Sequence, residues 1–382
     1  MIPFARMMIY GNKVKGTQVR NMEMAMTHLT ILDSDGALTF YGTNNYGSMG
    51  LGSTSTTLGW FDGNITDVDS IWHNNTNVSV AIKKDGTVWM CGAWRGTMFG
   101  TPNLGTTPSV SWVEITDRLT FNALDVAQVI IAYSFCTFLL KNGDIYSTDS
   151  TLGGTVVTNP NGYTGWRVSR YSTRLVKLAT YSDVQSYGNV YTAIDVNGKA
   201  YGIGSDTWKQ VTNGGSGTIT SWTPTLASYT VTDIIFGGNF NAFLTSDGRV
   251  FYSGISGVIN PANINNTVNS YAVVGAGIAS RIFSTGSGLY HIRQPNTMWG
   301  SFGNNQAPIA NSNALNTTQH NVRTMPLDNI LIEYLFCTVQ KNMVVIYFDS
   351  STNKRRMFCI GPIANNNNAL TFAEIDFPTK YT

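Results

Sequence analysis

One short pattern recurs along the chain and constrains the fold more than any other feature. An alternating apolar run leads to an Asp-Gly or Asn-Gly pair, and a second alternating run ends near another glycine. The pairs end at five glycines, which are Gly36, Gly86, Gly143, Gly198 and Gly248. Asp or Asn before Gly suits the positive φ angles of a tight turn between two strands, so each copy predicts a β-hairpin.

The spacing of the hairpins predicts how many units the chain contains. The five glycines stand 50, 57, 55 and 50 residues apart, and two further copies turn near Asn296 and Asn353. Each unit holds about four strand-like segments, as in one blade of a β-propeller, whose sheet is buried only against neighbouring blades. The sequence therefore predicts an all-β, seven-bladed β-propeller of four-stranded blades, with residues 1–382 as a single domain.

The two ends of the chain lead to a prediction of how the ring closes. The segment "TFAEID" (371–376) has the same pattern as "SWVEIT" (111–116), which precedes the hairpin at Gly143. No hairpin follows the C-terminal copy, and the first unit begins without an equivalent segment. We therefore expect residues 370–377 to pair into the first blade, so that N- and C-terminal segments close the ring. A pair of β-sandwiches is the alternative fold, but it needs no sevenfold period.

Composition limits the classes of function. Charged residues make up 12% of the chain and the net charge is +2, which argues against a nucleic-acid binder because phosphate binding relies on many cationic side chains. No signal peptide and no apolar run of membrane length is recognisable. We expect no membrane insertion. The cysteines Cys91, Cys136, Cys337 and Cys359 lie in apolar strand-like runs, which predicts buried free thiols.

The first unit resembles the repeat of the regulator of chromosome condensation family. In "FYGTNNYGSMGLG" the matching residues are Gly42, Asn44, Tyr46, Gly47, Gly50 and Gly52. His28, eight residues before Gly36, matches the histidine of that repeat. Later units keep little of the motif, and Val78, Phe135, Val190 and Phe240 replace the histidine. The resemblance implies a seven-bladed propeller; relatives include a nucleotide-exchange factor for a small GTPase, which also docks on chromatin, and a secreted β-lactamase inhibitor.

No catalytic constellation is recognisable in the sequence. His28 fits a structural position inside a blade, and His73, His291 and His320 show no spacing of metal ligands. The chain lacks a nucleophile elbow and a phosphate-binding loop. We therefore expect no catalytic residue, no cofactor and no metal. Two carboxylates from different blades could still meet near the axis, so an enzyme acting on glycans stays an alternative.

Aromatic and Arg side chains in loops after a blade's strand predict a binding site. Tyr46 occupies such a loop in the first unit, and Trp94 and Arg95 occupy it in the second. These residue types are enriched in binding hot spots. We expect Tyr46, Trp94 and Arg95 to be accessible on one rim. The strand tryptophans Trp89, Trp112, Trp166 and Trp222 are instead expected to pack between blades.

These features favour a non-enzymatic structural or interaction protein. Low charge, a surface rich in Asn, Thr and Gly, and free cysteines are typical of a virion component, such as a bacteriophage tail, receptor-binding or capsid-decorating protein. Its partners are then other virion proteins or a host surface receptor, with several copies in one assembly. Such a protein is made in the host cytoplasm. The alternative is a soluble propeller module that inhibits or regulates a protein partner.

Overall fold

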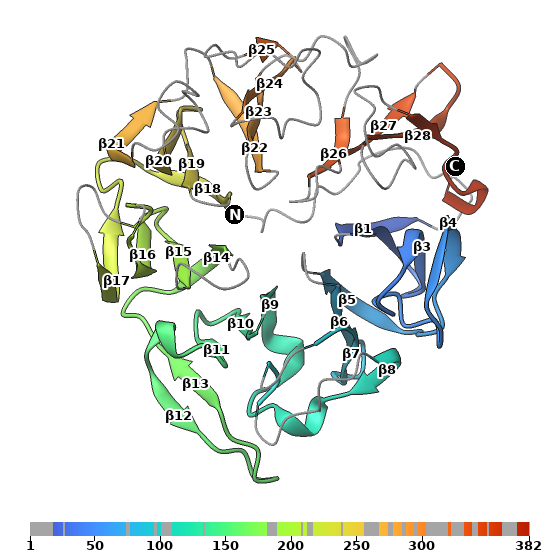
Figure 1. The fold of residues 1–382 in the computed structure, drawn as a ribbon, viewed down its shortest axis with the longest axis horizontal. Helices are drawn as coiled ribbons and strands as arrows, with labels where there is room; N and C mark the ends of the chain where they lie inside the picture. The colour runs from blue at the N-terminus through green and yellow to red at the C-terminus, as the bar shows by residue number, and fades with distance from the viewer. Residues whose placement is uncertain are drawn as a thin grey trace.

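The chain folds into seven antiparallel sheets arranged around one axis (Figure 1). Six sheets have four strands and one has five, so the predicted seven-bladed, all-β propeller is confirmed. Blades one to seven are numbered in chain order. The computed structural model describes residues 18–25, 27–73, 77–94, 98–100, 109–132, 134–181, 189–207, 209–211, 217–237, 240–255, 267–273, 278–284, 288–293, 297–302, 320–321, 332–337, 343–349, 351–360 and 373–381.

Each blade runs outward from the axis in sequence order. The innermost strands are β1 (Val19–Met24), β5 (Val68–His73), β9 (Val126–Ile131), β14 (Leu175–Tyr181), β18 (Val231–Phe236), β22 (Ala279–Ser284) and β26 (Ile332–Cys337). The second strands are β2 (His28–Asp33), β6 (Val78–Lys83), β10 (Cys136–Leu140), β15 (Val190–Asp195), β19 (Phe240–Thr245), β23 (Gly288–Arg293) and β27 (Met343–Asp349).

The outer half of each blade consists of a third and a fourth strand. The third strands are β3 (Leu38–Asn44), β7 (Val88–Gly92), β11 (Ile145–Ser147), β16 (Ala200–Ser205), β20 (Val250–Ile255), β24 (Thr297–Phe302) and β28 (Lys354–Ile360). The fourth strands are β4 (Ser55–Asp62), β8 (Ser109–Glu114), β13 (Trp166–Ser169), β17 (Thr218–Thr225), β21 (Thr267–Val273), β25 (His320–Asn321) and β29 (Ala373–Ile375).

The predicted hairpin glycines occupy equivalent turns between the second and third strands of blades one to five. Their φ angles lie between 76° and 94°. Each glycine N–H donates to the carbonyl three residues earlier, as Gly36 does to Asp33. In blade seven, Asn353 takes a positive φ of 56° at the same turn, whereas Asn296 lies outside the described residues. The repeat interpretation is therefore confirmed where it can be observed.

Three of these turns also join their blade to the next by a backbone hydrogen bond. The Gly36 carbonyl accepts from the Val68 N–H at 3.0 Å, and the carbonyls of Gly198 and Gly248 accept from the first residue of the following blade at 2.7 and 2.8 Å. A Cβ atom on Gly36 would lie 2.9 Å from both the N and O atoms of Val68. Glycine is therefore needed both for the left-handed φ and for the close approach of two backbones.

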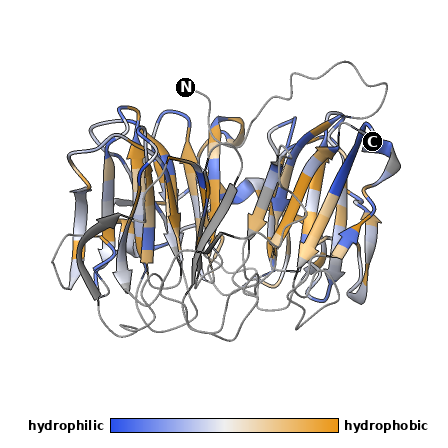
Figure 2. Cartoon of the chain, turned by 90° about the horizontal axis from the view of Figure 1, so that it is seen from above, coloured by the Kyte–Doolittle hydropathy of each residue, from blue (hydrophilic) through white to orange (hydrophobic). Residues whose placement is uncertain are grey.

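Between blades the contacts are apolar. Among the described residues, each hydrophobic cluster joins two neighbouring blades, as Phe40 of blade one and Ile71 of blade two illustrate. Figure 2 shows hydrophobic residues concentrated along the strands and hydrophilic residues at many of the turns. Three predicted buried thiols are confirmed, and the strand tryptophans pack against these clusters, namely Trp89, Trp112, Trp166 and Trp222.

The predicted ring closure by terminal strand pairing is wrong. Strand β29 pairs with β28 of its own blade, with Phe358 opposite Glu374. Blade one needs no further strand because β4 already completes it. The two similar segments are indeed equivalent, since β8 and β29 are both fourth strands. The sequence interpretation placed the segment at the start of a unit, although it ends the preceding one.

Side chains close the ring instead. A cluster of Met22, Leu29, Ile31 and Tyr41 from blade one packs on the last blade and on Phe377 and Tyr381 beyond it. The hydroxyls of Thr39 and Tyr381 lie 2.8 Å apart, and the Trp60 Nε1–H donates to the Asp376 carbonyl at 3.1 Å. The short η7 helix (Thr379–Tyr381) therefore fastens the C-terminus to blade one.

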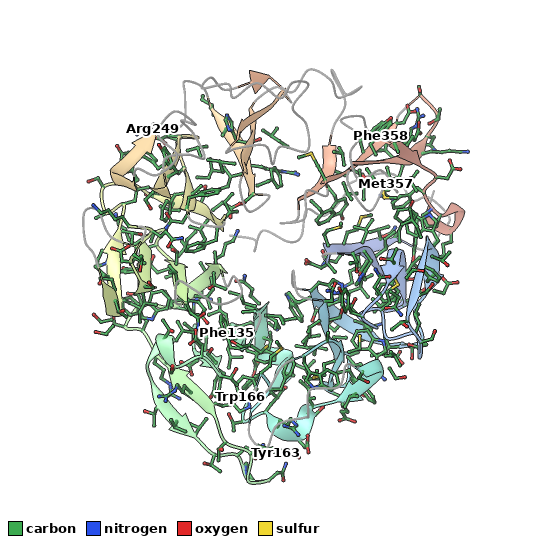
Figure 3. The ribbon with its side chains drawn as sticks, in the orientation of Figure 1. Phe135, Tyr163, Trp166, Arg249, Met357 and Phe358 are labelled. Atoms are coloured by element: carbon green, nitrogen blue, oxygen red, sulfur yellow. The ribbon has the colours of Figure 1, made fainter. Side chains whose placement is uncertain are left out.

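Blade three carries an additional outer strand. Strand β12 (Thr155–Val157) pairs with β13, and the chain between them turns at Gly162. Tyr163 from this turn contacts η1 (Thr116–Arg118) of blade two, because its ring lies 4.4 Å from the Arg118 guanidinium and its hydroxyl donates to Asp117 at 2.9 Å. Trp166 of the same hairpin is buried in the core (Figure 3). The insertion thus ties blade three to blade two.

Two Gly→Ala substitutions distinguish two destabilising effects: the strain of a positive φ in a tight turn, and the steric clash of a new Cβ with the next blade. Gly36 and Gly162 both have positive φ (92° and 83°), but no atom lies within 4 Å of a Cβ on Gly162. We expect Gly162→Ala to lower the free energy of unfolding by about 1 kcal/mol, from φ alone. Gly36→Ala should cost about 3 kcal/mol because it also overpacks the contact with Val68. Denaturant unfolding measures both; equal costs would contradict the contact between blades.

Candidate binding surface around the axis

Of the three predicted binding residues, one is exposed, one is buried and one lies outside the described residues. Tyr46 is 45% exposed, as expected. Trp94 is only 5% exposed and packs in the core between blades two and three, near Phe99 and Trp166. The prediction of an exposed Trp94 is therefore wrong, because burying the indole in this core is more favourable than exposing it to water. Arg95 lies outside the described residues.

The loop that presents Tyr46 is held by Asn44. The Asn44 side chain donates to the Ser53 carbonyl at 2.6 Å and accepts from the Met49 N–H at 2.9 Å. Asn44 is fully buried. Tyr46 is thus exposed on a loop that its own motif residues hold in place.

The propeller has two distinct faces. We call the side with the hairpin glycines the turn face. The opposite side, with the turns between first and second strands and the loops after third strands, is the loop face. These two kinds of segment lie together, since Thr43 N–H donates to Thr27 O in blade one and Ala93 N–H donates to Asn77 O in blade two, both at 3.0 Å. Tyr46 belongs to the loop face.

Near the turn face, carboxylates of the innermost strands form ion pairs. Arg20 of blade one contacts Asp69 of blade two at 2.5 Å, and Lys177 of blade four pairs with Asp233 of blade five. In blade seven, Glu333 pairs with Arg355 at 2.9 Å. Each of these carboxylates is therefore neutralised by a cationic side chain of the same protein.

Near the loop face, the innermost strands present a different surface. Each fifth residue of these strands is half-buried in all seven blades, although the fourth residue is buried wherever its side chain is described. The repeated partial exposure indicates that these seven positions border the axis. We call them the axial ring: Glu23, Trp72, Ile130, Ala179, Ile235, Phe283 and Phe336.

The axial ring is apolar except for Glu23. Neighbouring innermost strands contact one another around the whole ring, so these residues follow in blade order. Burial raises the pKa of the Glu23 carboxyl to about 7, while the Asn21 amide, whose Nδ2 lies 3.3 Å from Glu23 Oε1, opposes the shift.

The sequence analysis missed this ring. If the seven innermost strands are aligned on their first apolar residue, the axial ring positions fall at the same place in each strand.

A second missed feature is a histidine pair between blades one and two. The rings of His28 and His73 lie 4.9 Å apart in an edge-on arrangement. Ser79 Oγ donates to the Ser48 carbonyl at 2.5 Å, so His73 Nδ1–H donates to Ser79 Oγ at 2.7 Å. The structural position predicted for His28 is confirmed, since its side chain is fully buried. The sequence analysis considered the histidine spacing only for metal ligation, and so it missed that His28 and His73 contact each other.

The histidine pair is held neutral. Burial lowers the pKa of His28 to about 3. Burial, and secondarily the neighbouring His28 imidazole, lowers the pKa of His73 well below its usual value. Hydroxyl groups and aromatic rings contact the imidazoles, and among the described residues no carboxylate forms an ion pair with either. Protonation would place an uncompensated charge between two blades.

Comparisons with known proteins support the fold. No known protein family and no curated protein sequence matches this chain. Among solved structures, yeast RCC1 (Prp20) bound to Kap60 matches with a TM-score of 0.64 and 13% identity over 84% of this chain and 78% of the yeast chain. Prp20p from Saccharomyces cerevisiae, in a second structure, has a TM-score of 0.63 and 12% identity, over 84% and 80% of the chains.

Human WBSCR16 is similar to the same extent. Its TM-score is 0.60 at 14% identity, and the match covers 85% of each chain. The chain has an RCC1-like propeller fold. Among the residues that the structure describes, there is no helix of the length and hydrophobicity needed to span a bilayer.

The buried histidines make stability depend on pH. Both are neutral in the fold, whereas in the unfolded chain they take up protons below about pH 6.5. The contribution of the histidines should therefore be constant above this pH and fall below it, by about 1.4 kcal/mol per pH unit for each histidine. Glu23, whose pKa is raised from 4.5 to about 7, has the opposite sign and offsets part of this loss between those two values. His28→Val installs the residue found at this position in blades two and four. Unfolding measured from pH 8 to pH 4 should show a shallower loss for the variant; identical slopes would contradict the assignment.

Proposed function

We propose that this protein is a non-enzymatic interaction module that binds a protein partner at the loop face, around the axial ring. The observation that carries the proposal is the ring itself, six half-buried apolar side chains and one carboxyl at equivalent positions. Partly exposed apolar side chains gathered at one place are typical of binding sites. The exposed Tyr46 lies on the same face.

The ion pairs formed by the carboxylates near the axis favour a binding function over a catalytic one. A glycan-cleaving site needs two facing carboxyl groups with separate roles. Near the axis, Asp69, Asp233 and Glu333 pair with cationic side chains of the protein, and they join strands or blades. The histidine pair lies between blades one and two, and both imidazoles are held neutral. These groups serve the architecture of the propeller.

Within this class, we propose a role as a virion component, in a bacteriophage tail, in receptor binding or in capsid decoration. The low charge of the chain and its uncharged polar surface support this setting. Its partners are then neighbouring virion proteins or a host surface receptor. The second candidate is a soluble module that regulates a protein. The structural likeness to yeast RCC1, a protein described bound to Kap60 and with binding to Gsp1p and histones, favours it.

Site-specific photo-crosslinking in the source organism tests the proposal. A photoreactive amino acid replaces Tyr46 on the loop face or, as a matched control, the exposed Asp85 on the turn face. We expect adducts with a defined protein from position 46 and few from position 85. Mass spectrometry identifies the adduct, and sedimentation shows whether the chain travels with particles.

The outcomes separate the candidates. Adducts with capsid, tail or receptor proteins in the particle fraction support the virion role. A stoichiometric complex with one soluble protein supports the regulatory module. Adducts confined to position 85 would overturn the assignment of the loop face.

A further inference from the structure

The single charged member of the axial ring points to the chemistry of the partner. Glu23 is the fifth residue of β1, and its neighbours in the ring are Trp72 on β5 and Phe336 on β26. Strand β1 contacts both of these strands. In the order of the ring, Glu23 therefore follows Phe336 and precedes Trp72, at the loop-face end of the innermost strands. The Phe336 ring packs between blades seven and one, and the Trp72 ring packs between blades two and three.

The direction of the Glu23 side chain follows from its strand neighbours. Met22 and Met24 pack in the cluster that joins blade one to blade seven. Side chains alternate along a strand, so Glu23 projects from the opposite side of β1, toward blade two. Its partial exposure means that a group arriving along the axis can reach it.

Glu23 differs from the other carboxylates of the innermost strands. Asp69, Asp233 and Glu333 each have an ion-pair partner from within the protein. The Asn21 amide donates a hydrogen bond to Glu23, and among the described residues no cationic side chain pairs with it. A carboxyl in an apolar ring without a cation is costly to ionise, and an incoming cation removes that cost.

We propose that Glu23 anchors a cationic side chain, a Lys or Arg that the protein partner carries on an apolar segment and inserts at the loop-face end of the axial ring. This inference deepens the proposed function and depends on it for the identity of the partner. The ammonium or guanidinium group forms a charge-assisted hydrogen bond with the carboxylate. The apolar residues of the axial ring bury the alkyl part of its side chain.

The pKa of Glu23 provides a direct readout of the site. Because burial raises this pKa to about 7, the group releases its proton in an accessible range. A cation that binds next to the carboxyl stabilises the ionised form, so its titration must move to lower pH.

The test uses n-butylammonium as the probe and 1-butanol as its uncharged counterpart. In protein labelled with ¹³C at glutamate, the Glu23 carboxyl resonance is followed against pH. We expect butylammonium to move the Glu23 titration to lower pH in a saturable way and 1-butanol to leave it unchanged. At pH 8, Glu23→Gln should weaken butylammonium binding about tenfold or more, as expected for loss of a charged hydrogen bond.

The matched control is Glu374→Gln, since Glu374 is exposed and pairs with Arg356 at the outer edge of blade seven. It should bind butylammonium like the wild type. A Glu23 titration that does not respond to butylammonium, or equal losses in both variants, would overturn the proposal. If the probe fails while Tyr46 still crosslinks a protein, the cation site is wrong and the proposed function stands. A clear probe response without loop-face adducts supports the site and counts against the function.

Discussion

The hydrogen bond between a turn glycine and the first strand of the next blade is the interaction on which this propeller depends. A four-stranded sheet of this size cannot bury both faces alone, so each blade requires a neighbour in a fixed position. The Gly36 carbonyl and the Val68 N–H provide that position for blades one and two, and Gly198 and Gly248 do so further along. At Gly36 the two backbones approach so closely that a side chain on the glycine does not fit.

This geometry also determines where binding can take place. Because the turns fix the blades at one face, the innermost strands all run toward the other face and bring equivalent residues around the axis. Charged pairs such as Arg20 with Asp69 join blades close to the turns. Apolar side chains and Glu23 come together at the loop face. A backbone contact found at three of the junctions thus helps to hold together a ring whose two ends differ chemically.

The sequence predicted the features that depend on local pattern. An Asp-Gly or Asn-Gly pair between alternating runs specifies a hairpin whatever its surroundings, so the turns and the blade count followed directly. His28 was also interpreted correctly as structural. Its partner His73 was missed because the two meet only across the contact between blades. They stand 45 positions apart in a sequence where the repeat itself varies from about 48 to 57 residues.

The errors arose where tertiary packing decides the outcome. Trp94 follows a strand like an exposed loop residue, yet the contact between blades two and three offers its indole an apolar environment. The segment "TFAEID" was recognised as equivalent to "SWVEIT", but pattern alone does not say whether a strand opens one blade or completes the previous one. The axial ring likewise depends on the register of seven strands, which becomes apparent only once the blades are aligned.

Hydrogen exchange at the first amide of blades two, five and six tests the central claim most directly. The amides of Val68, Val231 and Ala279 donate to the turn glycines of the preceding blades. If these bonds hold the ring together, the three amides exchange only through global unfolding, and their protection equals the full free energy of unfolding. Exchange through local opening, with protection several kcal/mol below that value, would contradict the account.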